Sequence, residues 1–212
     1  FILLIFELFM IDILMEGSVD KKDNELLKMI KNGNLAYELI RPQDFYFKWY
    51  IKMLAKKLVA TLLRFSPIII LGIILPYPFH LSAPISIESF IIFIVALFLA
   101  LFLTTSLNLC IHILIMFTLD EKGTMTIYSV IAELFMGAIV PIPFFPLWLQ
   151  KIAYILPFRF IGDFPFRIYS GSISINEGYN MLLSSFIWII ITIFVGHIIS
   201  KCALKKAVIQ GG

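Results

Sequence analysis

Residues 90–117 read FIIFIVALFLALFLTTSLNLCIHILIMF and form the longest apolar run in the chain. A helix needs about 20 residues to cross the hydrocarbon core of a bilayer, so this run is long enough for a tilted or extended transmembrane helix. The run therefore predicts that the chain crosses a membrane.

The composition agrees with that prediction. The chain has 212 residues, of which 60% are hydrophobic and 15% are charged. Its mean hydropathy is +0.97. A soluble domain of this length cannot bury so much apolar surface, so we expect an integral membrane protein. The two cysteines, Cys110 and Cys202, lack the spacing of a metal or redox motif, and we expect no disulfide between them.

Apolar and polar segments alternate along the chain. We expect full spans at four places, residues 58–75, 90–117, 125–140 and 181–199. Residues 1–15 are apolar but too few for a span, and we interpret them as the end of a truncated one. Residues 16–57 are polar and rich in lysine. The predicted fold is an all-α polytopic helix bundle with about five spans, in a single transmembrane domain covering residues 1–212.

The distribution of cations predicts the orientation. Of the 17 lysines and arginines, thirteen lie in residues 16–57, in the turn near Gly123 and in the C-terminal tail, and three lie in residues 141–178. Cytoplasmic loops carry an excess of lysine and arginine. We therefore expect the segment around Asn32, the Gly123 turn and the C-terminus in the cytoplasm.

A short helical pattern lies within the cytoplasmic segment. The turn signal Asn32-Gly33-Asn34 precedes NLAYELIRP, and the helix should stop near Arg41 because the residue before Pro42 is disfavoured in the α region. A short amphipathic helix between spans is suited to docking on a soluble partner. The alternative is a helix that lies on anionic lipid, helped by the surrounding lysines.

Residues 141–178 cannot form an ordinary span, because prolines occur at positions 141, 143, 146, 157 and 165. Irregular backbone at membrane depth persists only where protein covers it or water lines it. We expect two short helices that dip in from the outer side, at residues 147–155 and 164–169. The aromatic residues Trp148, Tyr154 and Tyr169 suit the level of the lipid headgroups.

Taken together, these segments resemble the permease subunits of ABC transporters in the ABC-2 class. A cytoplasmic signature I-x-x-G-x-L-A-x-x-L-x-R-P is matched by Ile30, Gly33, Leu35, Ala36, Leu39, Arg41 and Pro42. A block G-x-I-x-P-x-x-F-F-P-x-W-L is matched by Gly137, Ile139, Pro141, Phe144, Phe145, Pro146, Trp148 and Leu149. The blocks L-P-F and P-x-x-I-Y-x-G follow at Leu156, Pro157, Phe158, Pro165, Ile168, Tyr169 and Gly171.

The resemblance implies half of an exporter. Members of that class have six membrane helices, the first of which is missing here, and two permeases pair in the cell membrane as a homodimer or a sibling heterodimer. A cytoplasmic coupling helix docks on an ABC ATPase subunit, which implies contact through Gly33, Asn34, Leu35, Tyr37, Glu38, Arg41 and Pro42. Re-entrant outer helices cap the pathway, which implies that role for Gly137, Pro141, Phe145, Pro146, Trp148, Pro157, Pro165 and Gly171.

The sequence has no Walker-type G-x-x-x-x-G-K-[ST] motif and no H-E-x-x-H motif. We therefore expect no catalytic residues, no metal site and no cofactor in this chain, with ATP and magnesium bound by the partner ATPase. The expected partners are that ATPase, the second permease and membrane lipid. We expect no binding to nucleic acid.

Polar residues inside the predicted spans are the remaining candidates. Glu133 lies within a span, where an ionised carboxylate is costly, so it is either a pathway or interface residue or a hydrogen-bonded acid in the bundle interior. Thr104, Asn108 and His112 follow an i, i+4, i+8 pattern on one helix face. Such a stripe either joins helices or lines a substrate path.

Two other function classes remain open. A secondary transporter or channel working without ATP would need several intramembrane charges, and this chain offers few, chiefly Glu133 and His112. A membrane subunit that senses or confers immunity without transporting is the second rival. A membrane-embedded enzyme is the weakest interpretation, because no nucleophile, base and orienting group occur together.

Overall fold

A computed structural model describes residues 26, 29, 43–76, 83–118 and 120–210 of the chain. These residues contain helices and no strand, which confirms the all-α fold class. The α-helices are α4 (Phe45–Ile74), α5 (Ile87–Thr118), α6 (Glu121–Met136), α7 (Leu147–Ile155), α8 (Asp163–Tyr169) and α9 (Ile175–Gln210). Two 3₁₀ helices, η1 (Ile142–Phe144) and η2 (Pro157–Phe160), lie between them.

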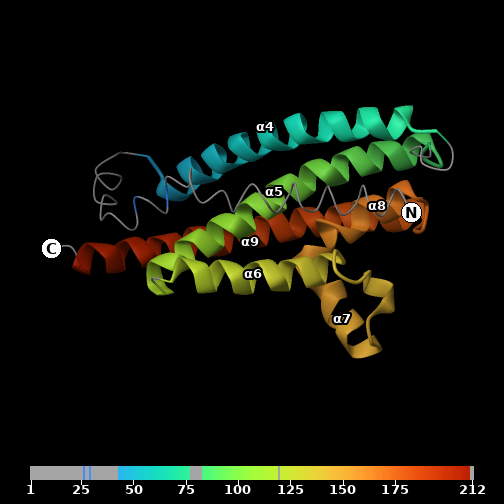
Figure 1. Cartoon of the computed structure of the whole chain (residues 1–212). Coiled ribbons are helices and arrows are strands. Elements are labelled where there is room, and N and C mark those ends of the chain that lie inside the picture. The colour runs from blue at the N-terminus through green and yellow to red at the C-terminus, as the bar shows by residue number, and fades with distance from the viewer. Residues whose placement is uncertain (1–25, 27–28, 30–42, 77–82, 119, 211–212) are drawn as a thin grey trace.

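Helix α5 is the centre of the bundle. It packs most extensively against α9 and also contacts α4, α6 and α8. Figure 1 shows the four long helices α4, α5, α6 and α9 running along one common direction, while α7 projects from the bundle. The start of α4, the α5–α6 turn and the end of α9 share one end, and α8 lies near the opposite end (Figure 1).

Two of the described helices, α5 and α9, are long and apolar enough to cross a membrane. They contain the spans predicted at residues 90–117 and 181–199. The span predicted at 58–75 falls mainly in α4, and the one at 125–140 falls mainly in α6. Helix α6 has 16 residues and so rises only about 24 Å, less than the hydrocarbon thickness of about 30 Å. The spans in α4 and α6 remain predictions.

The boundaries of α6 follow from its sequence. Asp120 caps the start, since its Oδ1 accepts a hydrogen bond of 3.0 Å from the backbone N–H of Gly123. Gly137 ends the helix with φ of 87°, a left-handed conformation that glycine adopts without steric cost. Its N–H bonds to the carbonyl oxygens of Glu133 and Leu134. The helix within the predicted span 125–140 therefore ends at Met136.

Three helices meet closely at Gly196 of α9. A Cβ atom at this position would lie 2.5 Å from Cε2 of Tyr46 on α4 and 2.8 Å from Sγ of Cys110 on α5. Tyr46 is fully buried there, with its ring 6.0 Å from the His197 ring in an edge-on arrangement. Glycine is the one residue that permits this approach.

We expect Gly196→Val to destabilise the bundle. The added side chain must displace Tyr46 or Cys110, and overpacking of this kind costs about 1–3 kcal/mol. Thermal unfolding of the purified protein in detergent measures the loss. The matched control is Val195→Ala, at an exposed neighbour on the same helix. Equal melting of Gly196→Val and wild type would show that the three helices are not held at this spacing.

Candidate functional site

The predicted coupling residues, Gly33, Asn34, Leu35, Tyr37, Glu38, Arg41 and Pro42, lie outside the described residues, and their role remains a prediction. The described part of the chain resumes at residue 43, directly after them. Asp44 caps α4, since its Oδ1 accepts a hydrogen bond of 3.0 Å from the N–H of Phe47. The same oxygen lies 3.6 Å from Nδ1 of His197 on α9. The helix that follows the coupling segment is therefore in direct contact with the last helix.

The predicted polar stripe lies inside the bundle. Thr104, Asn108 and His112 are all buried on α5. Thr104 donates a hydrogen bond to the carbonyl oxygen of Ala100, and His112 Nδ1 lies 2.6 Å from the carbonyl oxygen of Asn108. Thr104 and His112 thus each make a hydrogen bond within α5. Whether the stripe joins helices or lines a path remains a prediction.

A polar contact between α5 and α9 was not found from the sequence. The hydroxyl oxygens of Ser106 and Thr192 are 2.7 Å apart and share a hydrogen bond. One turn along α5, Cys110 Sγ donates to the carbonyl oxygen of Thr192 at 3.6 Å. The signal for this face of α9 was a row of small residues at helical spacing, all buried: Ser185, Thr192, Gly196, Ser200 and Ala203.

Glu133 is half-buried on α6, beside the fully buried Ala132. The structure brings Thr104, Asn108 and His112 onto one buried face of α5, while Glu133 belongs to a different helix. Its role as a pathway or interface residue remains a prediction.

Prolines begin η1, α7 and η2 within residues 141–178, which we call the outer segment after the side predicted for it. Pro141 and Pro146 precede η1 and α7 with φ of −54° and −55°, and Pro157 is the first residue of η2. Proline at a helix start costs no hydrogen bond, because that N–H has no helical partner. Gln150 closes the loop by donating from Nε2 to the carbonyl oxygens of Ile142 at 3.3 Å and Pro143 at 3.1 Å. Helix α7 covers the residues predicted for the first short helix, and α8 begins one residue before the second.

The outer segment has a buried face and an exposed face. Among the predicted outer residues, Gly137, Phe145, Pro157 and Pro165 are buried, while Pro141, Pro146, Trp148 and Gly171 are exposed. Trp148 is 65% exposed, in keeping with an interfacial position. Tyr169 differs from Trp148 in exposure. Its ring is buried, 5.0 Å from the ring of Phe93, because α8 packs this face against α5.

Arg159 joins the parts of the outer segment, a role that its place in the sequence does not indicate. Its side chain is buried, with Cζ 4.7 Å from the Tyr154 ring centroid and 5.3 Å from that of Phe160. Nη1 donates to the carbonyl oxygen of Tyr154 at 3.4 Å, and Nη2 to Sδ of Met181 at 3.6 Å. The guanidinium thereby connects α7 and η2 with α9.

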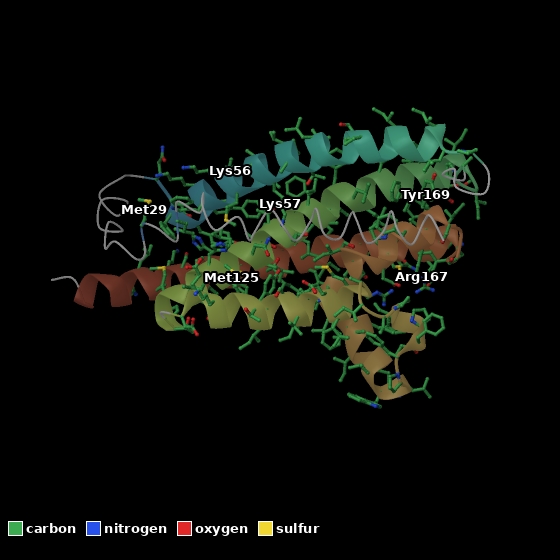
Figure 2. The ribbon with its side chains drawn as sticks, in the orientation of Figure 1. Met29, Lys56, Lys57, Met125, Arg167 and Tyr169 are labelled. Carbon is green, nitrogen blue, oxygen red and sulfur yellow. The ribbon has the colours of Figure 1, made fainter. Side chains whose placement is uncertain are left out.

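Two charged residues of α8 lie near this arginine. Arg167 Nη1 is 3.5 Å from Oδ2 of Asp163, and Figure 2 shows Arg167 at the α8 end of the bundle. Burial raises the pKa of Asp163, against the opposing influence of Arg167 and Arg159. The outer segment thus contains a buried group of charges within a mostly apolar surface. No group of three or more histidine, cysteine or acidic side chains that could hold a metal ion occurs in the described part of the chain.

Comparison with known proteins gives one match. A family model described as ABC-2 family transporter protein matches residues 1–211. No curated protein and no solved structure matches the chain. The match covers nearly all of the 212 residues, so it applies to the bundle and the outer segment together.

We expect Arg159→Ala to lower the midpoint of thermal unfolding, because two ring contacts and two hydrogen bonds are lost. A buried cation–π contact is worth up to about 2 kcal/mol. Arg159→Lys should recover only part of the loss, since an ammonium cannot reproduce the planar stacking and the two separate donors. Lys151→Ala, at an exposed cation of α7, is the control. Full stability in Arg159→Ala would contradict a connecting role.

Proposed function

The chain belongs to the ABC-2 family of transporter proteins, and we propose that it is the permease subunit of an ATP-binding-cassette exporter. In this proposal it spans the cell membrane, forms half of the translocation pathway and is driven by ATPase subunits on separate chains. The observation that carries the proposal is the family match over residues 1–211. Permeases of this family work with ATPase subunits generally.

The arrangement of the helices supports the proposed orientation. The start of α4, the Gly123 turn and the end of α9 share one end of the bundle, and these are the regions whose excess of cations predicts the cytoplasmic side (Figure 1). Helix α8, in the outer segment, lies toward the other end (Figure 1). The lysine-rich end would then face the ATPase, and the outer segment would cap the pathway.

The position of α4 supports a coupling role for residues 33–42. Helix α4 begins three residues after Pro42, and its start contacts α5 and α9. Tyr50 donates a hydrogen bond of 3.2 Å to the carbonyl oxygen of Phe102 on α5, while Asp44 meets His197 on α9. A displacement of the coupling segment by the ATPase would thus be passed directly to α5 and α9.

The interior of the bundle supports a pathway between two copies. On α5 the inward side chains Leu103, Leu109 and Ile113 are fully buried, so side chains fill the space around the central helix. The proposed pathway therefore lies between this chain and a second permease, either identical or a sibling. The exported substrate would move along that interface.

Two measurements test the proposal: copurification of the chain with an ATPase, and the coupling of ATP hydrolysis to transport. We expect an ABC ATPase subunit, coexpressed with the full-length chain, to copurify and to show ATP-driven transport when both are reconstituted in vesicles. Reversing the charges at Glu38 and Arg41 should abolish copurification or the coupling of ATP hydrolysis to transport, because the predicted docking contacts become repulsive.

Charge reversal at Lys151, an exposed residue of α7 in the outer segment, is the control and should leave association intact. Normal ATP-driven transport after deletion of residues 33–42 would refute the coupling role. Transport that persists without any ATPase would instead favour a secondary transporter or channel.

A further inference from the structure

Lys57 of α4 is a buried cation. It is 4% exposed, and its ammonium has no hydrogen-bond partner among the described residues. The other buried charged residues in that part of the chain, Arg159 and Asp163, both have polar or ionic contacts with neighbouring groups. An ionised side chain in an apolar interior is costly unless it is paired, and such a residue marks a functional site by default.

The adjacent lysine has the opposite environment. Lys56 is exposed, whereas Lys57 is directed toward the bundle interior. Figure 2 labels Lys56 beside α4 and Lys57 between α4 and α5. A lysine with no function beyond its place near the lipid headgroups would extend its ammonium to water, because its apolar stem is long enough to reach. Lys57 does not do so.

A second polar group without a partner lies one turn further on the same face of α4. Thr61 is 8% exposed, and its hydroxyl has no hydrogen bond to any described residue. The other buried serine and threonine hydroxyls of the described chain are all hydrogen-bonded: Ser89, Thr104, Thr105, Ser106, Ser185, Thr192 and Ser200. Thr61 is the exception, and it lies at i+4 from the unpaired ammonium.

The two groups are suited to one ligand. Residues at i and i+4 have Cβ atoms about 5–6 Å apart, so an ammonium and a hydroxyl at these positions can both donate to one carboxylate or phosphate group. Helix α5, which packs against α4, adds no negative charge that would neutralise the Lys57 ammonium. His112 of α5 interacts electrostatically with Lys57, and Glu121 of α6 is the acidic group that interacts with His112.

The surface of α4 next to this site is apolar. Val59, Leu62 and Leu63 are all more than half exposed, as expected of side chains that face lipid acyl chains. An amphiphile could therefore lay its chain along α4 while its anionic group reaches Lys57 and Thr61.

We propose that Lys57 and Thr61 bind an anionic group, a phosphate or a carboxylate, of the molecule that this permease transports. The inference rests on the proposed function and adds to it the chemical class of the substrate. The site is closed in this conformation, since both side chains are buried, so binding accompanies an opening between α4 and α5.

The first test is the stability of the full-length permease without added ligand. If the ammonium is unpaired, Lys57→Met removes a desolvated charge and leaves no orphaned partner, so the thermal midpoint stays the same or rises. Lys56→Met is the matched control and should also leave it unchanged. A large fall in the midpoint of Lys57→Met alone would overturn the proposal, because it would show that Lys57 neutralises an acid of the protein itself.

The second test measures ligand binding by the permease in phosphatidylcholine nanodiscs. The probes are dodecyl phosphate, inorganic phosphate and dodecyltrimethylammonium. We expect dodecyl phosphate to bind, with a loss of affinity of about tenfold or more in Lys57→Met and a smaller loss in Thr61→Val. Lys57→Arg should retain most of the affinity, and Lys56→Met should match wild type.

The probes separate the possible sources of the anion. Binding of inorganic phosphate in competition with dodecyl phosphate supports a site for a free anion, and binding of dodecyl phosphate alone supports an amphiphile. Equal binding of dodecyltrimethylammonium, or unchanged dodecyl phosphate binding in Lys57→Met, overturns the proposal. If an ATPase copurifies while Lys57→Met binds normally, the anion site fails and the proposed function stands. If Lys57-dependent binding occurs and no ATPase associates, the permease function fails and the anion site stands.

Discussion

Helices within a bilayer gain little by hiding apolar side chains from one another, because lipid chains are as apolar as leucine. What holds such a bundle together is close approach and hydrogen bonding. The contact between α5 and α9 supplies both. Ser106 and Thr192 share a hydrogen bond across it, and Gly196 lets Tyr46 and Cys110 come close to the α9 backbone. Helices α4, α6 and α8 pack against this pair, so the position of the outer segment, which contains α8, also depends on it.

The outer segment follows the rule that backbone groups removed from water must find partners. Its prolines lie at helix starts, where no N–H is needed, and the Gln150 side chain satisfies two carbonyl oxygens between η1 and α7. Arg159 packs on the Tyr154 ring within the segment and joins the segment to α9 by donating to the sulfur of Met181. Irregular backbone and a buried cation thus stabilise each other.

Local features of this fold could be predicted from the sequence, whereas contacts between distant segments could not. Proline spacing located α7 and α8 to within one residue, because a proline fixes its own φ and disfavours the α region for the residue before it. The i, i+4, i+8 spacing placed Thr104, Asn108 and His112 on one face of α5. The bond between Ser106 and Thr192 joins residues 86 positions apart, and no periodicity within one helix predicts its partner.

The direction of single side chains was equally hard to predict. Tyrosine is typical of membrane interfaces, yet the ring of Tyr169 on α8 packs against Phe93. The sequence pattern does not distinguish the adjacent lysines Lys56 and Lys57. Only the rotation of α4 about its axis makes one of them exposed and the other buried. On the same helix, Tyr46 approaches Gly196 of α9 and Tyr50 donates to α5, and both contacts join residues far apart in the sequence.

The glycine contact has a further consequence for the inner end of the molecule. Where α4, α5 and α9 meet, the space beside the Cα of Gly196 holds a hydrogen atom but not a methyl group. The Cys110 thiol lines part of that space. Covalent bulk on that sulfur would act as a wedge on all three helices at once. The Cys110 thiol, together with the Tyr46 ring, therefore limits how closely the three helices approach at the end on which the ATPase is proposed to act.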